Sequence, residues 1–179
     1  PEQIWVADIT YIPGNVKRHY LHLVTDAYSK QIMGYELSDT LEARSTLAAL
    51  RMALSNRSYP ESDLIHHSDR GLQYCSSMYT ELLKKKGIQI SMTEHGDPYE
   101  NAIAERVNGI LKEEFGLHYV DNYNESTSLL VAQAITIYNQ FRPHLSCKMM
   151  TPCKMHAQKD VKVKTWKRKT SSEQISLEV

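Results

Sequence analysis

The order of the apolar runs constrains the fold of this sequence more than any other feature. Three runs rich in β-branched and aromatic residues follow one another at short spacing, at 4–12, 19–26 and 31–38. The first run, IWVADITYI, stops at Pro13-Gly14, a dipeptide typical of turns. Because short connections join neighbouring antiparallel strands, the first 38 residues are predicted to form an antiparallel meander.

The following part of the chain alternates between helical and strand patterns. Apolar residues recur at helical spacing at 40–56, with Glu42 predicted in the first turn, where the helix dipole favours an acid. Short strands are predicted at 63–67 and 88–92, on either side of a helix at 77–87 that ends with a glycine. Strands separated by helices join a sheet through crossovers, so the predicted fold class is α/β, a five-stranded mixed sheet with helices on both faces.

Two further helices are predicted towards the C-terminal end. The first, at 97–115, has Asp97 as a cap, Pro98 at the first helical position and Glu100 at a spacing typical of a capping box. The second is predicted at about 125–141, where apolar residues again recur at helical spacing. With 179 residues, the chain suits a single domain.

Charge is unevenly distributed along a chain that is neutral as a whole. The stretch 148–169 holds eight lysines and arginines against Asp160 alone, a net charge of +7. We therefore predict a core at 1–152 followed by a basic, poorly ordered extension at 153–179. Such a segment can contact phosphates, and a solvated chain end is an equally good interpretation.

Composition excludes several other classes of protein. The three cysteines are odd in number and lack the spacing of a zinc site, which fits reduced thiols without a metal. No segment resembles a signal peptide, and no apolar run is as long as a membrane-spanning helix. We therefore expect a soluble cytoplasmic protein. The absence of an initial methionine suggests a fragment of a longer chain.

The helix predicted at 97–115 carries a polar face. At about 100° per residue, Glu105 lies on the side away from the apolar stripe of this helix. Asn101, Asn108 and Lys112 stand at i−4, i+3 and i+7 from Glu105 and are expected to share its face. The face suits a ligand, although an ordinary solvent-exposed face is the commoner explanation of such a pattern.

Two aspartates stand at notable positions, one where a carboxylate is unusual and one where it can meet a ligand. Asp8 lies inside the most hydrophobic predicted strand, where a charge is costly unless it is paired or binds a cation. Asp69 follows a strand end, where open α/β sheets assemble their sites. Together with Glu105 they form an oxygen-rich set that suits Mg²⁺ or Mn²⁺ better than zinc. Two such ions can activate the oxygen that attacks a phosphodiester and stabilise the oxygen that leaves it. The three acids therefore predict phosphoryl transfer.

Four motifs in this order resemble those of one family. WVADITYI, HHSDRGLQY and ENAIAERVNGILKEEF are similar to the catalytic core of the DDE recombinases, the retroviral integrases and the related insertion-sequence transposases. Asp69 and Glu105 are separated by 35 residues, the spacing typical of that family, and YNQFRPHLSCKMMTP resembles its downstream signature. The resemblance implies a ribonuclease-H-like fold with Asp8, Asp69 and Glu105 as catalytic metal ligands.

The resemblance also implies DNA-binding roles for residues near the acids. These residues are Asn101, Asn108, Lys112, His67 and Gln73. Glu100, Arg106 and Cys147 depart from the residues usual in the transposases, whereas the three acids are intact.

The implied function is a transposase core that cuts the ends of an element and joins them to double-stranded target DNA. We expect a homodimer or higher oligomer, and recognition of the DNA end by a segment before Pro1 or by a partner chain, because no helix-turn-helix or zinc finger is evident. One alternative is a ribonuclease-H-like nuclease that hydrolyses without joining, for which Glu42 is the only candidate fourth carboxylate. Another is a non-catalytic DNA-binding or assembly module.

Several other polar and aromatic residues have structural interpretations. Asp26 is predicted to cap a turn between strands, and His66 to be a strand-end imidazole rather than a metal ligand. Stacking on bases and packing in the core remain open for four tyrosines, namely Tyr11, Tyr74, Tyr99 and Tyr138.

Overall fold

The computed structural model describes residues 1–13, 18–93, 101–119 and 125–162. Its strands are β1 (Ile4–Ile12), β2 (His19–Asp26), β3 (Ile32–Ser38), β4 (Ile65–Ser68) and β5 (Gln89–Met92). Its α-helices are α1 (Ala43–Ser55), α2 (Leu72–Cys75), α3 (Ser77–Lys85), α4 (Ala102–Glu113), α5 (Glu125–Gln140) and α6 (Pro152–His156). The predicted order of strands and helices is confirmed, and α2 and α6 are additional. The predicted caps of the helix at 97–115, Asp97, Pro98 and Glu100, lie outside the described residues.

The five strands form one mixed sheet in the order β3-β2-β1-β4-β5. β1 pairs antiparallel with β2, and β2 pairs antiparallel with β3, as the short connections predicted. β1 pairs parallel with β4, which the chain reaches through β2, β3 and α1, and β4 pairs parallel with β5 across the crossover formed by α2 and α3. β1 therefore lies at the centre, with an antiparallel neighbour on one side and a parallel neighbour on the other.

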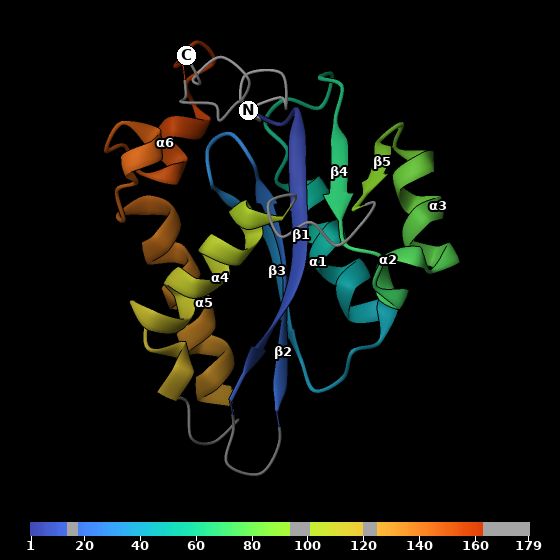
Figure 1. Cartoon of the computed structure of the whole chain (residues 1–179), viewed down its shortest axis with the longest axis horizontal. Coiled ribbons are helices and arrows are strands. Elements are labelled where there is room, and N and C mark those ends of the chain that lie inside the picture. The colour runs from blue at the N-terminus through green and yellow to red at the C-terminus, as the bar shows by residue number, and fades with distance from the viewer. Residues whose placement is uncertain (14–17, 94–100, 120–124, 163–179) are drawn as a thin grey trace, which may run out of the picture.

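Helices cover both faces of the sheet, as predicted (Figure 1). Trp5 and Ala7 of β1 belong to a core that also contains buried residues of α1 and α3. Ile12, on the other face of the same strand, belongs to a second core with residues of α4 and α5. Since successive side chains of a strand alternate between faces, Asp8 must lie on the α4 side of the sheet.

The close approach of α1 to β3 depends on a glycine. A Cβ atom added at Gly34 would lie 2.2 Å from the carbonyl oxygen of Ala49 and 2.4 Å from the backbone nitrogen of Ala53. Both atoms belong to the helix backbone, so they cannot move aside as a flexible side chain would. The spacing between α1 and the sheet is therefore fixed by the absence of a side chain at position 34.

Glu42 differs from its prediction in position. It stands at the N-cap of α1 rather than in the first turn, and its side chain makes no capping hydrogen bond. Its carboxylate is exposed and lies 3.0 Å from Nε of Arg44. The helix begins at Ala43, three residues after the predicted start at position 40.

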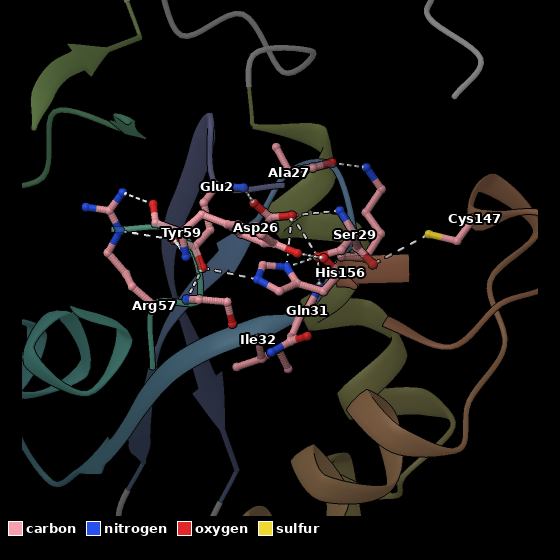
Figure 2. A network of polar contacts seen from close by, with 12 residues as sticks. Glu2, Asp26, Ala27, Ser29, Gln31, Ile32, Arg57, Tyr59, Cys147 and His156 are labelled. Carbon is pink, nitrogen blue, oxygen red and sulfur yellow. Dashed lines mark hydrogen bonds and ion pairs between the residues drawn. The ribbon is translucent and has the colours of Figure 1, made fainter. Parts of the chain in front are cut away.

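A buried polar network joins segments that are far apart in sequence (Figure 2). The Glu2 carboxylate accepts hydrogen bonds from Nε of Arg57 (3.0 Å) and the backbone N–H of Ser58 (2.6 Å), and lies 3.2 Å from Nε2 of His156. Asp26 accepts hydrogen bonds from the backbone N–H and the hydroxyl of Ser29, both at 2.7 Å, which confirms its predicted turn-capping role. The network thus connects the residues before β1, the turn after β2 and α6.

The boundary predicted after Pro152 falls inside α6. Met155 and His156 are buried, and His156 belongs to the polar network, so these residues are part of the folded unit. Residues 163–179 of the predicted extension lie outside the described residues. Among the described helices, none is long and apolar enough to span a membrane.

His66 and the tyrosines whose roles the sequence did not decide lie in different environments. His66 is buried, with Nε2 2.8 Å from the hydroxyl of Tyr79, which supports its structural interpretation. Tyr74 and Tyr138 are buried in the core, and Tyr11 is 49% exposed. Tyr99 lies outside the described residues.

We predict that Gly34→Ala lowers the free energy of unfolding by about 3 kcal/mol, because the new methyl group must displace helix backbone. Chemical denaturation of both proteins measures the difference. Gly109→Ala is the matched control: nothing lies within 4 Å of the position that its methyl group would take, and alanine is the better helix former, so stability should stay equal or rise. An unchanged stability of Gly34→Ala would contradict the proposed fixed spacing of α1 and the sheet.

Candidate active site

Asp8 and Asp69 are held side by side by the pairing of two parallel strands. The register of β1 and β4 pairs Ala7 with Ser68, the last residue of β4, so the next residue of each chain segment is an aspartate. Both aspartates line a hollow of about 160 Å³ at the end of β4. Its other lining residues are Ile9, Tyr11, Leu41, Gln73 and Tyr74.

The turn after β4 fixes the carboxylate of Asp69. Its Oδ1 accepts a hydrogen bond from the backbone N–H of Gly71 at 2.9 Å. A Cβ atom at Gly71 would lie 2.9 Å from that same oxygen and 3.1 Å from Oε1 of Gln73. Any side chain at this position would push the carboxylate aside, so the glycine allows Asp69 to fold back over the turn.

Asp8 carries a carboxyl group in an environment that disfavours its charge. The pKa of Asp8 is raised to about 6, mainly by burial and also by the charges of Asp69 and Glu105, against the opposing effects of the Ile9 backbone N–H and Lys112. The repulsion by the two acids indicates that all three carboxylates are close enough to interact. A bound cation would relieve both the repulsion and the cost of burial.

Asn108 holds the Asp8 carboxylate from the facing helix. Its Nδ2 donates a hydrogen bond to Oδ2 of Asp8 at 2.6 Å. The amide oxygen of Asn108 is buried and has no hydrogen-bond partner among the described residues. The donor set on this side of the sheet is therefore made of oxygens, two of them charged, and hard oxygen ligands fit Mg²⁺ or Mn²⁺.

Glu105 stands beside this site without forming its wall. It lies in the first turn of α4, and its side chain is exposed. Its charge acts on Asp8, but it does not line the hollow. Within the described ranges, no group of three acidic, histidine or cysteine side chains is arranged so that it could hold a metal ion directly. The structure thus brings two of the three predicted ligands together and leaves the third nearby.

The predicted polar face of α4 points partly into the protein. Asn101 occupies the N-cap position and, like Asn108, is buried, whereas Lys112 is half-buried and Glu105 exposed. The prediction that this face turns away from the packed side of the helix is therefore wrong for the two asparagines. They lie inward because α4 packs against β1, with Asn108 in contact with Asp8.

His67 and Gln73 make contacts within the protein. Nδ1 of His67 lies 2.9 Å from the hydroxyl of Ser91, and its Nε2 is buried without a hydrogen-bond partner in the described part of the chain. Nε2 of Gln73 donates a hydrogen bond to the carbonyl oxygen of Leu41 at 2.9 Å. Both residues lie near the acids, and their contacts with DNA stay predictions.

The contact between Asn108 and Asp8 was not foreseen from the sequence. The two residues are 100 positions apart, so no local pattern connects them. Helical spacing placed Asn108 on the same face as Glu105, and the alternation of β1 placed Asp8 on one face of the sheet. The contact could have been predicted only if the face of the sheet that α4 covers had been known.

Comparison with known sequences identifies relatives over most of the chain. Two integrase core domain family models match residues 1–98 and 86–152. A putative transposase for insertion sequence element IS986/IS6110 of Mycobacterium tuberculosis is 34% identical over 164 residues, which are 88% of this chain and 58% of the relative. Transposase InsF for insertion sequence IS3A of Escherichia coli is 35% identical over 155 residues, 85% of this chain and 53% of the relative. The chain spans a little over half the length of these curated relatives.

Solved structures of retroviral integrases have the same fold. The HTLV-2 integrase catalytic core domain in complex with magnesium superposes with a TM-score of 0.70 and 21% identity, covering 87% of this chain and 97% of that one. A chain of the simian T-cell lymphotropic virus intasome in complex with PP2A regulatory subunit B56 gamma gives a TM-score of 0.76 and 19% identity, covering 95% of this chain and 59% of that one. These likenesses confirm the predicted ribonuclease-H-like fold. Together with the family models and the transposase relatives, they show that this chain belongs to the integrase core family, as a catalytic core of the kind found in insertion-sequence transposases.

Proposed function

We propose that this chain is the catalytic core of a DNA transposase that cleaves and joins DNA with a divalent cation held by Asp8, Asp69 and Glu105. The observation that carries the proposal is the pair of aspartates in one hollow, of which Asp8 is half-buried and repelled by two other acids. Removing such a carboxylate from water costs free energy unless a ligand compensates its charge. The HTLV-2 integrase core, which shares the fold, was solved with magnesium.

Each acid has a different part in this proposal. Asp8 and Asp69 are held in place by β1 and the turn after β4, so their oxygens are ready to receive a cation. Glu105 is exposed at the start of α4, where a change of its side-chain rotamer costs little, and so supplies the third carboxylate when a cation arrives. The cation, Mg²⁺ or Mn²⁺, supplies Lewis-acid stabilisation of the oxygens that gain negative charge during phosphodiester exchange.

Double-stranded DNA is the proposed substrate, as both element end and target. Lys112 lies about two turns along α4 from Glu105, and its charge acts at the site, where it favours the ionised form of Asp8. We propose that Lys112 also contacts a DNA phosphate, with Asn101, His67 and Gln73 near the scissile bond. A homodimer or larger assembly would supply one catalytic core for each element end.

We expect this chain to reseal a branched DNA that mimics the joined product, in the presence of Mn²⁺ or Mg²⁺. Glu105→Gln should abolish the reaction, because it removes a ligand charge while the exposed side chain contributes little packing. The measurement is gel separation of the labelled products with the metal ion present or chelated. Glu113→Gln, which changes another exposed glutamate of the same helix, is the matched control and should react normally.

The products of that reaction distinguish the candidate functions. Cleavage of the branched DNA without joining would favour the hydrolytic nuclease. Full activity of Glu105→Gln would remove this residue from the site. A folded chain that binds DNA but shows no metal-dependent reaction would favour the non-catalytic module.

We predict that Asp8→Asn makes the protein more stable at pH 7 without metal. The raised pKa of Asp8 means that the native protein binds the proton more tightly than the unfolded chain, so stability falls as the pH rises from about 4 to about 6. The loss is roughly 2–3 kcal/mol and persists at pH 7. An asparagine avoids this loss, and its amide can also donate to the unpaired oxygen of Asn108.

Thermal or chemical denaturation over pH 4–7.5 in a metal chelator measures this effect. Asp63→Asn, at an exposed position, is the control and should follow the wild-type profile. Adding Mn²⁺ should then raise the midpoint of the wild type and leave that of Asp8→Asn unchanged. An Asp8→Asn variant that is less stable than the wild type at pH 7 would show that the Asp8 charge is compensated within the protein itself.

We predict that Lys112→Ala weakens DNA binding about equally for all sequences. If its ammonium group neutralises one phosphate, the slope of log affinity against log salt should fall by about 1. Fluorescence anisotropy at several salt concentrations, with Ca²⁺ in place of Mg²⁺, measures both quantities. Lys84→Ala, in α3 on the opposite face of the sheet, is the control, and equal slopes for the two variants would argue against a DNA contact of α4.

A further inference from the structure

Tyr74 has a buried hydroxyl group without a hydrogen-bond partner. The residue follows the Asp69 turn in α2 and is only 2% exposed. Its ring packs edge-to-face on Tyr79 at 5.5 Å between ring centroids and tilts against His66 at 6.4 Å. Its hydroxyl oxygen has no hydrogen-bond partner among the described residues. Leaving a hydroxyl unpaired in the interior is unfavourable, so this group needs an explanation.

The neighbouring Tyr79 shows that the same cluster can satisfy a tyrosine. Tyr79 is 1% exposed, and its hydroxyl lies 2.8 Å from Nε2 of His66. The two tyrosines therefore share a burial state and contact each other's rings, but only one has a partner. Packing and the contact with His66 account for Tyr79, but they leave the hydroxyl of Tyr74 without a partner among the described residues.

The surroundings of Tyr74 indicate where an acceptor would stand. Tyr74 lines the hollow together with Asp8 and Asp69. Burial raises the pKa of Tyr74 well above its usual value, and the charges of Asp8 and Asp69 contribute to this shift, so the hydroxyl lies within electrostatic reach of both acids. A hydroxyl that keeps its proton is a hydrogen-bond donor. The hollow, at about 160 Å³, has room for several water molecules or for a phosphate group.

We propose that Tyr74 is a positioning residue of the site, whose hydroxyl donates a hydrogen bond to an oxygen atom in the hollow between Asp8 and Asp69 when a cation is bound there. The oxygen belongs either to water or to a DNA phosphate, and both are good acceptors. This inference rests on the proposed metal-dependent function. It adds a group that orients the oxygens around the cation without itself being a metal ligand.

Mn²⁺ titration followed by electron paramagnetic resonance tests the proposal without relying on turnover. Four proteins are compared, namely the wild type, Tyr74→Phe, Tyr79→Phe and Asp69→Asn. Tyr74→Phe should bind Mn²⁺ about fivefold more weakly or worse, as expected from the loss of one hydrogen bond, while its thermal midpoint stays equal or rises because the unpaired hydroxyl is gone. Tyr79→Phe should behave in the opposite way, with normal Mn²⁺ affinity and a lower midpoint, because it loses the bond to His66.

A second arm identifies the acceptor. Anisotropy of a labelled branched DNA with Ca²⁺ measures whether Tyr74→Phe weakens DNA binding. Weaker Mn²⁺ binding in the absence of DNA assigns the acceptor to water, and weaker DNA binding with normal Mn²⁺ affinity assigns it to a phosphate oxygen. If Tyr74→Phe matches the wild type in both measurements, while Asp69→Asn has lost Mn²⁺, the proposal for Tyr74 is wrong and the metal site stands. If the wild type does not bind Mn²⁺, both the role of Tyr74 and the metal site itself are wrong.

Discussion

The parallel pairing of β1 with β4 is the contact on which the site depends. Its register aligns Ala7 with Ser68, so Asp8 and Asp69 follow at adjacent positions, one still within β1 and the other just beyond the end of β4. A shift by one residue would turn Asp8 towards the core beneath α1 and α3. The register is in turn maintained by packing on both faces, because Trp5 and Ala7 fill one core while Ile12 fills the other. The chemistry proposed for the acids is thus a consequence of how two apolar cores hold one strand.

Some of the buried groups that the fold leaves without partners lie at the site, and others lie elsewhere in the described part of the chain, such as Nε1 of Trp5 and Nε2 of His22 and of His144. Asp8 has a raised pKa, and both the amide oxygen of Asn108 and the hydroxyl of Tyr74 are buried without partners among the described residues. Elsewhere, buried charges are compensated: Glu2 contacts Arg57 and His156 in the network of Figure 2, and Asp26 is bonded to Ser29. The contrast between a satisfied network and an unsatisfied hollow is what favours a ligand at Asp8 and Asp69.

Much of the fold could be predicted from the sequence, because the signals are local. Periodicity and turn residues gave the meander and the helices, and Gly87, with a φ of 67°, follows α3 as its C-terminal signal predicted. The rule about strand ends indicated a site at Asp69 only, and Asp8 was grouped with it because a charge inside an apolar strand is costly unless it is paired or binds a cation. Contacts between distant segments could not be predicted in this way. The Asn108–Asp8 hydrogen bond spans 100 residues and the Glu2–His156 contact spans 154 residues, and no periodic pattern in the sequence indicates either of them. The inward turn of Asn101 and Asn108 was missed because the sequence does not say which side of α4 faces β1.

We propose that Asp8 and Asp69 hold a divalent cation in the hollow that they share. Diffraction from crystals of this chain grown with Mn²⁺, recorded near the manganese absorption edge, tests it most directly. We expect an anomalous peak between the two carboxylates, with the side chain of Glu105 turned towards it, and no such peak in crystals of Asp69→Asn. Manganese found only at other positions, or a hollow that stays free of metal at saturating Mn²⁺, would show that Asp8 and Asp69 do not form a cation site.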